Sequence, residues 1–175
     1  MLHRLALAEK RSVASFPSLA AGEEVGAVCP AGEACEAAAF EGRFGGDAPA
    51  FESVTVETLD ALLPGATVDF LLLDVEGYDP LVLAGGRETV ARARFLEFEY
   101  HFRGAWAEDV TLERTAADLD AAGFDCYLQG AHSALWRLSR GCFHAAFELR
   151  AWSNVACVRR DEPAWAAILD ERAVY

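Results

Sequence analysis

The chain has 175 residues, of which 53% are hydrophobic and 25% charged, and its formal net charge is −13. This size and composition predict one folded globular domain with a sizeable core and exclude a disordered chain. The strong negative charge argues against a nucleic-acid partner, because phosphate binding needs clustered Lys and Arg.

The first residues do not resemble a targeting signal. The segment "MLHRLALAEKRSVASF" holds a short apolar patch followed by charges, which is not the pattern of a secretory signal. No apolar run approaches the roughly 18 residues that a membrane-spanning helix needs. We therefore predict no membrane segment and expect, by default, a cytoplasmic protein.

The cysteines give a weak signal. The chain has five of them, so at least one thiol is unpaired. Cys29 and Cys35 flank the segment "CPAGEAC", which would close a small loop in an oxidising compartment. Their spacing matches no zinc pattern, and we expect both thiols to be free.

The first part of the chain predicts two short strands and a long irregular segment. Residues 2–8 and 11–16 alternate between polar and apolar side chains in the manner of strands. Residues 17–50 are rich in Ala, Gly, Glu and Pro and show no sustained period. That composition predicts a long surface excursion within the domain.

The next segment, "FESVTVETLDALLP", predicts a strand and a short helix. Val54 and Val56 mark the strand. Thr58 can cap the helix, which should end before Pro64.

The middle of the chain predicts a strand, a helix and a second strand. Residues 68–74 are apolar at positions on both faces, which predicts a central strand covered by helices on each side, with a cleft beyond its carboxyl end. Residues 78–93 predict a helix with Pro80 in its first turn, although two glycines interrupt the apolar face. Residues 94–102 predict a strand with Phe95, Glu97 and Glu99 on one face and Leu96, Phe98 and Tyr100 on the other.

The last part predicts one clear helix and three strands. Thr111 can cap a helix that ends at Gly123, and strands are predicted at 124–129, 133–139 and 153–160. The order of elements predicts an α/β fold whose sheet begins parallel and ends with a C-terminal antiparallel hairpin. With no internal repeat or linker, residues 1–175 are expected to form a single domain.

Carboxylates follow two of the predicted strands. Asp74 and Glu76 come directly after the strand at 68–74, and Glu99 lies near the end of the next strand. Because ligands of open parallel sheets sit beyond the carboxyl ends of the strands, these side chains are candidates for a site. A structural interpretation competes with this one, in which Asp74 caps the next helix, Glu76 accepts turn amides and Gly77 supplies a tight bend.

The wider context, "VTVETLDALLPGATVDFLLLDVEGYDPLVLAGG", resembles the FkbM family of S-adenosylmethionine-dependent methyltransferases. That family pairs a Thr-Leu-Asp segment with a strand that runs into Asp-Val-Glu-Gly, an acid and a Val-Leu pattern. The residues that carry the resemblance are Thr58, Leu59, Asp60, Asp74, Val75, Glu76, Gly77, Tyr78, Asp79, Val82, Leu83 and Gly85. "RFLEFEYH" is similar to the family's next strand, so the specific part of the resemblance covers residues 53–101.

The resemblance implies a fold, a cofactor and a reaction. It implies a Rossmann-like class I methyltransferase sheet that transfers a methyl group from S-adenosylmethionine to a hydroxyl oxygen. The acceptor would be a sugar or another small hydroxyl-bearing molecule. The segment "LALAEKRSVASF" is similar to the family's strand end and hairpin, so the resemblance places Ala6, Leu7, Asp74 and Val75 beside the cofactor.

The resemblance also implies catalytic positions. These are Asp74, Glu76, Glu99 and His101, with His101 as a candidate base near the acceptor hydroxyl. Asp74 and Glu99 alone are too few oxygen ligands for magnesium, so we predict no metal.

Two departures from the family pattern affect this interpretation. Leu72 stands where the family often has lysine, and the glycine-rich turn and ribose-binding acid of these enzymes have no counterpart here. Met1 falls where the family's third strand begins, so the resemblance covers only the later part of the domain, and the sheet is expected to be incomplete at its N-terminus. We therefore expect weak binding of S-adenosylmethionine and possible self-association through an exposed sheet edge.

Two other interpretations stay open. In the first, the chain is a degenerate methyltransferase-like domain that acts by binding a partner. In the second, it is an unrelated α/β domain that happens to carry the motif.

Among the tryptophans, Trp136 and Trp152 are expected in the core, whereas Trp106 is the candidate for lining an acceptor pocket.

Overall fold

The computed structural model describes residues 5–17, 50–107 and 110–174. Cys29, Cys35 and nearly all of the excursion predicted at 17–50 lie outside the described residues, so the predictions for them stay predictions.

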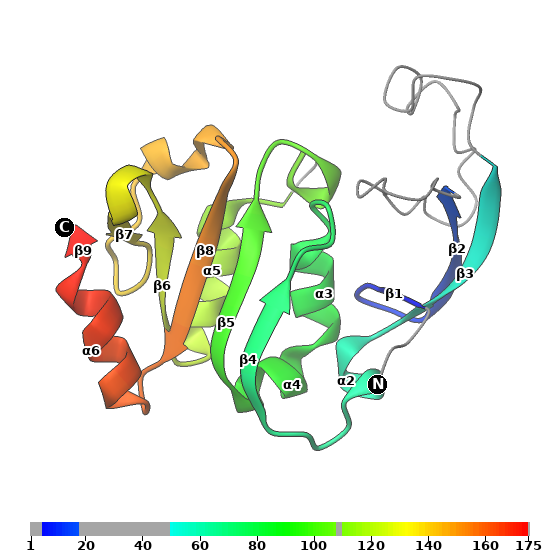
Figure 1. Ribbon diagram of the computed structural model, residues 1–175, viewed down its shortest axis with the longest axis horizontal. Helices are drawn as coiled ribbons and strands as arrows, with labels where there is room; N and C mark the ends of the chain where they lie inside the picture. The colour runs from blue at the N-terminus through cyan, green and yellow to red at the C-terminus, as the bar shows by residue number, and fades with distance from the viewer. Residues whose placement is uncertain (1–4, 18–49, 108–109, 175) are drawn as a thin grey trace.

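A mixed sheet of six strands forms the centre of the described structure (Figure 1). The strands lie in the order β4-β5-β8-β6-β7-β9. Their bounds are Val68–Leu73 for β4, Ala93–Tyr100 for β5, Phe124–Gln129 for β6, Leu135–Arg137 for β7, Ser153–Arg159 for β8 and Ala173–Val174 for β9. β4 runs parallel to β5, and β7 runs parallel to β9, whereas β8 is antiparallel to both β5 and β6. β6 and β7 are also antiparallel, so the mixed α/β class predicted from the sequence is confirmed.

A second, smaller sheet precedes it in the chain. Its strands are β1 (Ala6–Leu7), β2 (Ser12–Pro17) and β3 (Phe51–Glu57), with β3 in the middle. β3 leads into the short helix α2 (Leu59–Leu62), which Thr58 caps through its hydroxyl, as the sequence predicts. This small sheet lies to the side of the large one (Figure 1). Its strand β1 contacts helix α3 (Asp79–Gly85), which packs on the large sheet.

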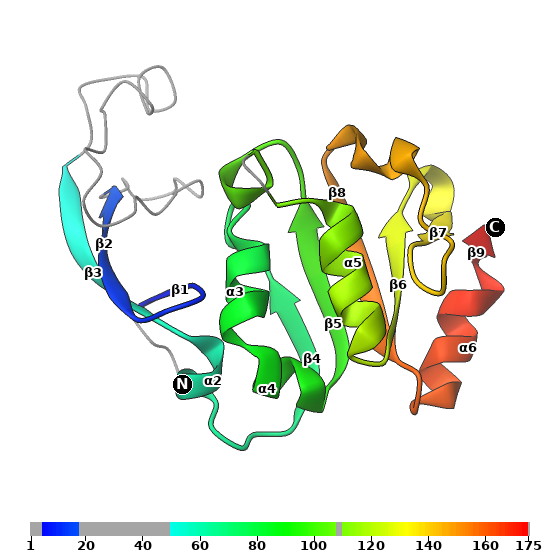
Figure 2. The ribbon, with the colours of Figure 1, turned by 180° about the vertical axis from the view of Figure 1, so that it is seen from behind.

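Four more α-helices belong to the large sheet in the described part of the chain. They are α3 (Asp79–Gly85), α4 (Arg87–Arg92), α5 (Leu112–Ala121) and α6 (Pro163–Glu171). Short 3₁₀ helices occupy Gly104–Ala107 (η1), Ala131–Ser133 (η2) and Ala145–Leu149 (η3). Figure 2 shows α3, α4 and α5 on one face of the sheet, with α6 beside β7 and β9 at the far end.

The helix predicted over residues 78–93 is two helices, because the chain turns at Gly86. Gly86 has φ −121° and ψ 23°, and a Cβ there would lie 2.7 Å from Cδ2 of Leu59. The carboxylate of Asp60 caps the N-terminus of α4, where it accepts hydrogen bonds from the backbone N–H groups of Glu88 (3.1 Å) and Thr89 (2.7 Å). Asp60, part of the family-like motif, therefore has a structural role as a helix cap.

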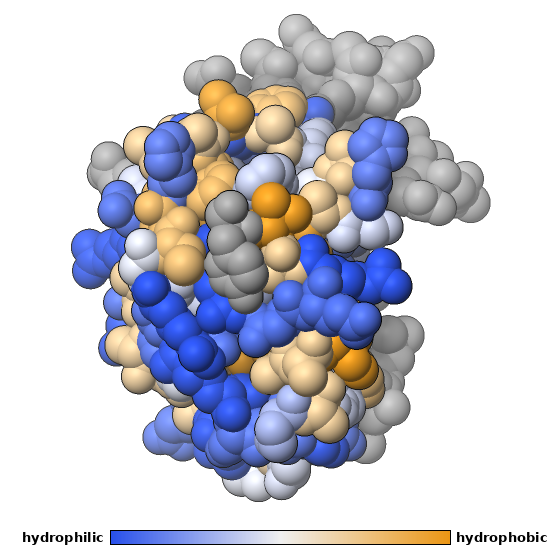
Figure 3. Space-filling view, turned by 90° about the vertical axis from the view of Figure 1, so that its left-hand side faces the viewer, coloured by the Kyte–Doolittle hydropathy of each residue, from blue (hydrophilic) through white to orange (hydrophobic). Residues whose placement is uncertain are grey.

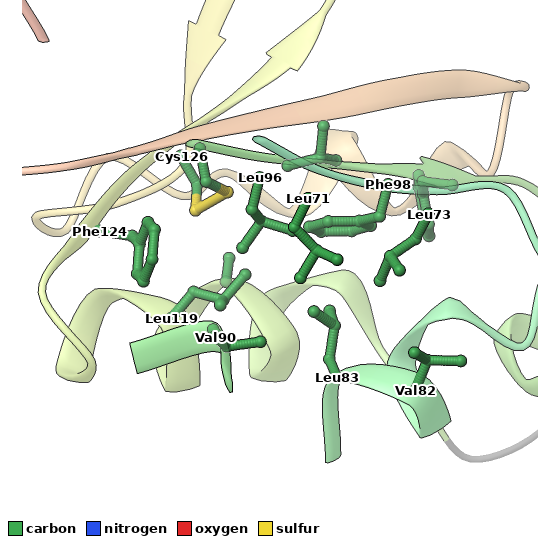
Figure 4. Packing of buried hydrophobic residues seen from close by; sticks show 14 of the residues in the cluster. Leu71, Leu73, Val82, Leu83, Val90, Leu96, Phe98, Leu119, Phe124 and Cys126 are labelled. Carbon is green, nitrogen blue, oxygen red and sulfur yellow. A yellow bond between two sulfur atoms is a disulfide. The ribbon is translucent and has the colours of Figure 1, made fainter. Parts of the chain in front are cut away.

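The core lies between the sheet and helices α3, α4 and α5. In β5, Leu96, Phe98 and Tyr100 are buried against the helices, whereas Phe95 and the two glutamates between them are only partly buried on the opposite face. Figure 4 shows the sheet residues pointing at the helix residues across this layer. The residues labelled there are Leu71, Leu73, Val82, Leu83, Val90, Leu96, Phe98, Leu119, Phe124 and Cys126. The two faces predicted for this strand are thus confirmed.

The central position predicted for the strand at 68–74 is wrong. β4 pairs only with β5 among the described strands, so it lies at an edge of the sheet. Its helix-facing residues Leu71 and Leu73 are buried, but Phe70 is 61% and Leu72 67% exposed on the other face. The physical reason is that α6 packs over β6, β7 and β8 on that face. It reaches β4 and β5 through the ring of Trp165, whose centroid lies 4.9 Å from that of Phe70 and 6.3 Å from that of Phe95.

A disulfide links two neighbouring strands inside the core. Cys126 of β6 and Cys157 of β8 stand opposite each other in register, and both are fully buried (Figure 4). Cys142 is exposed and has a free thiol. The sequence pattern does not predict the bridge, because the pairing depends on the register of strands separated by 31 residues.

The outer surface at the end of the sheet is mixed. Figure 3 looks at the end that carries α6 and β9, where hydrophilic residues form broad areas and strongly hydrophobic residues appear as isolated spots. No helix in the described ranges has the length and apolar composition to span a bilayer.

The edge position of β4 gives a paired mutational test. Leu71→Ala removes a buried side chain and should lower the free energy of unfolding by about 2–5 kcal/mol. Leu72→Ala, one residue further along, removes an exposed side chain and should change it by at most about 0.5 kcal/mol. Urea denaturation of both variants measures the difference, and equal large losses would show that β4 is covered on both faces.

Candidate functional site

The carboxyl ends of β4 and β5 lie beside the start of β8, because β8 runs antiparallel to β5 (Figure 1). The chain leaves β4 at Leu73 and enters α3 at Asp79 through a tight turn. Glu76 and Gly77 both take positive φ angles in this turn, 54° and 91°. A left-handed conformation at a non-glycine residue costs about 1–3 kcal/mol, and such residues often occur at functional sites.

Gly77 is required by a close crossing of two loops. A Cβ at Gly77 would overlap the carbonyl of Arg103, and a Cβ at Gly104 would lie 2.7 Å from both C and O of Gly77. The backbone N–H of Ala105 donates to the carbonyl of Gly77 over 3.0 Å. The glycine after the two acids therefore lets the loop beyond β5 lie directly against the turn beyond β4.

His101 is held at this crossing without contact with solvent. Its side chain is fully buried, and its Nδ1 accepts a hydrogen bond of 3.0 Å from the backbone N–H of Arg103. With Nδ1 acting as acceptor, the proton of the neutral ring belongs on Nε2. Nε2 lies 3.3 Å from Oε2 of Glu99 but out of line for a hydrogen bond, so it is a buried nitrogen without a hydrogen-bond partner.

The electrostatic surroundings of His101 favour the neutral ring. Burial lowers the pKa of His101 below its ordinary value and outweighs the carboxylates of Glu99, Glu76 and Asp74, which act in the opposite direction. These three carboxylates are the acids that the sequence places at the site, and the structure brings them within electrostatic reach of one imidazole.

Glu99 connects His101 to an aromatic side chain from another strand. Its Oε1 accepts a hydrogen bond from the indole N–H of Trp152, which precedes β8, and its carboxylate is mostly buried. The indole stacks on the His101 ring, with centroids 4.7 Å apart and an interplanar angle of 22°. The Arg103 guanidinium lies 4.9 Å from the centre of the same indole.

The expectations for the tryptophans are reversed. Trp106, the predicted pocket residue, is fully buried, and its indole N–H donates to the carbonyl of Glu99 over 2.9 Å. Trp136 and Trp152, the predicted core residues, are 38% and 50% exposed. The local pattern does not reveal this, because Trp106 folds back onto Phe98 and Tyr100 of β5, and the place of Trp152 depends on how β8 pairs with β5.

Asp79 is a functional candidate to which the sequence assigned no role. Its side chain is fully buried at the start of α3, with Oδ1 accepting from the backbone N–H of Glu99 over 3.3 Å and Oδ2 without a partner. Burial raises the pKa of Asp79 to about 6, and hydrogen bonds from backbone N–H groups oppose that rise. The sequence feature that could have identified Asp79 is its position directly after the turn and before Pro80, at the first residue of a helix.

The four residues predicted to bind the cofactor are divided between two sheets. Asp74 is exposed and Val75 partly buried at the end of β4. Ala6 and Leu7 form β1 in the small sheet, which contacts β3 and α3. In the ranges that the structure describes, no group of three or more His, Cys, Asp and Glu side chains is arranged to hold a metal ion.

Gly77 gives a prediction with an internal control. Gly77→Ala introduces both an unfavourable positive φ and an overlap with the backbone of Arg103. Gly123→Ala introduces a positive φ of the same size, 93° against 91°, into open space. We expect Gly77→Ala to be the more destabilising by about 1–3 kcal/mol, the usual cost of overpacking. Equal losses in chemical denaturation would mean that the loops do not cross closely.

Asp79 gives a prediction for pH. Since its pKa rises on folding from 3.8 to about 6, its contribution to stability is fully present below pH 3.8 and is lost as pH rises through 6. The free energy of unfolding of the wild type, relative to Asp79→Asn, should fall by about 2 kcal/mol between pH 4 and pH 7. Denaturation curves at several pH values measure this difference, and a constant difference would show that Asp79 does not titrate as described.

Comparison with known proteins adds one match. The family model described as the methyltransferase FkbM domain matches residues 13–126, more than half of the 175-residue chain. The matched region contains the turn beyond β4 together with Glu99 and His101, whereas Trp152 lies after it. Neither the curated proteins nor the solved structures contain a match.

Proposed function

This chain belongs to the FkbM methyltransferase family, and on that premise we propose that it is an S-adenosylmethionine-dependent O-methyltransferase. The proposed acceptor is a sugar or another small molecule that bears a hydroxyl group. The observation that carries the proposal is the Glu99–His101 pair, buried at the carboxyl end of β5 and inside the matched region. The parallel β4–β5 pair supports a Rossmann-like class I sheet, in which ligands lie beyond these strand ends.

The residues at the end of β4 fit one part of the proposed cofactor. Asp74 is exposed and Glu76 partly so, and two carboxylates beside each other accept hydrogen bonds from an ammonium or from hydroxyl groups. They would hold the amino-acid end of S-adenosylmethionine. When bound, the cofactor supplies a methyl group on a positively charged sulfur.

The acceptor hydroxyl needs a fixed position and a group that takes its proton. His101 is poorly placed for the second task, because its Nδ1 already accepts from Arg103 and its Nε2 carries the proton. We therefore assign the proton acceptor to Glu99. Each carboxylate oxygen of Glu99 has a further lone pair, so the carboxylate can accept from the hydroxyl while it keeps the hydrogen bond from Trp152.

Transfer of a labelled methyl group tests this proposal. The protein is incubated with S-adenosylmethionine at millimolar concentration and with a panel of neutral sugars and other hydroxyl acceptors. Glu99→Gln keeps the shape of the side chain but removes its charge, and kcat should fall by about 10²–10⁴, the usual contribution of a positioned base. Glu97→Gln, on the same face of β5 and bonded to Asn154, should retain activity.

Two outcomes would contradict the proposal. Equal activity of the wild type and Glu99→Gln would remove Glu99 from the reaction. Absence of both methyl transfer and cofactor binding, measured by calorimetric titration, would favour the other candidate, a methyltransferase-like domain that acts by binding a partner.

A further inference from the structure

Three rings meet beside Glu99 at the edge of the proposed acceptor site. His101 is fully buried, whereas Phe102 is 55% and Trp152 50% exposed. The Phe102 ring stands nearly perpendicular to both of the others, at 78° to His101 and 81° to Trp152. Large aromatic side chains that are half exposed at a site of buried polar groups are typical of ligand-binding surfaces.

The indole of Trp152 is fixed on two sides before any ligand arrives. Stacking on His101 sets the plane of the ring, and the hydrogen bond from its N–H to Glu99 sets its rotation. A ring that is already immobilised loses little conformational entropy when a ligand packs against it. The unpartnered Nε2 of His101, buried beside the same carboxylate, is a second sign that a polar group of a ligand belongs here.

The charges around the rings select the kind of ligand. The groups that act electrostatically on His101 are the carboxylates of Glu99, Glu76 and Asp74 and the guanidinium of Arg103. Three negative groups against one positive group disfavour an anionic ligand. A neutral polyhydroxylated ring offers hydroxyls to the carboxylates and apolar C–H groups to an aromatic face.

We propose that Trp152 is the residue on which the acceptor packs, and that the acceptor is an uncharged sugar ring whose hydroxyl binds Glu99. This inference rests on the proposed function and narrows its substrate class. Trp152 lies beyond residue 126, where the family match ends, so specificity for the acceptor comes from a part of the chain outside the matched region.

Binding of small glycosides tests the inference without methyl transfer. The probes are the methyl glycosides of glucose, galactose, mannose and xylose, together with methyl glucuronide, which differs from the glucoside by a carboxylate. Saturation-transfer NMR and titration of tryptophan fluorescence measure their binding to the wild-type chain. At least one neutral glycoside should bind, and the glucuronide should bind about tenfold more weakly than the glucoside at low salt.

Variants locate the binding surface. Trp152→Ala should weaken binding of the neutral glycoside at least about tenfold, and Trp152→Tyr, which keeps a ring, should restore part of it. Trp136→Ala is the matched control, because Trp136 is also partly exposed but packs against Phe147 rather than His101. It should bind the glycoside as the wild type does, and circular dichroism of each variant checks that it is folded.

The outcomes separate this inference from the proposed function. Binding that depends on Trp152, without methyl transfer, supports the inference and contradicts the function. Methyl transfer that is unchanged in Trp152→Ala and Trp152→Tyr contradicts the inference alone. Failure of all the neutral glycosides to bind, or preference for the glucuronide, also overturns it.

Discussion

The arrangement of the site depends on the contact between two glycines. Gly77 lies in the turn after β4, and Gly104 begins the 3₁₀ helix after β5. A Cβ on Gly104 would meet the backbone of Gly77, and a Cβ on Gly77 would overlap the carbonyl of Arg103, the residue before Gly104. Parallel strands alone would leave the two loops free to separate beyond the sheet. The contact, closed by the hydrogen bond from Ala105 to Gly77, fixes the loop that carries His101 against the turn that carries Glu76.

Burial of polar groups follows from that contact. His101 lies at the crossing and Asp79 at the start of α3, beside the backbone of Glu99. Each keeps one buried polar atom without a hydrogen-bond partner. Burial acts on both in the direction of the neutral form, lowering the pKa of His101 and raising that of Asp79. A buried polar atom without a hydrogen-bond partner costs about 1–3 kcal/mol, so the two beside Glu99 both lower the free energy of unfolding. Such local costs are expected where a site binds a ligand rather than where a core only packs.

The sequence predicted the features that depend on near neighbours and missed those that depend on distant ones. The caps at Thr58 and Thr111 and the two faces of β5 were correct, since each follows from residues within a few positions. The prediction that β4 is central and covered on both faces was wrong. An apolar run shows which faces of a strand can be covered, but not whether a helix covers them. The place of Trp152 beside His101 and the Cys126–Cys157 bridge depend on the register of β8 against β5 and β6, which no local pattern contains.

The candidate site therefore joins two segments that lie far apart in the chain. The turn after β4 and the end of β5 supply the carboxylates and the imidazole, and both lie within the family-matched residues 13–126. β8 enters the sheet from the opposite direction, so its first residues arrive at the same edge and place Trp152 over His101. An antiparallel strand inserted beside a parallel pair thus brings a later part of the chain to the strand ends where ligands bind. The crossing of Gly77 and Gly104 does not involve Trp152, so a change at Trp152 leaves the two loops in contact and removes only the hydrogen bond to Glu99 and the stacking on His101.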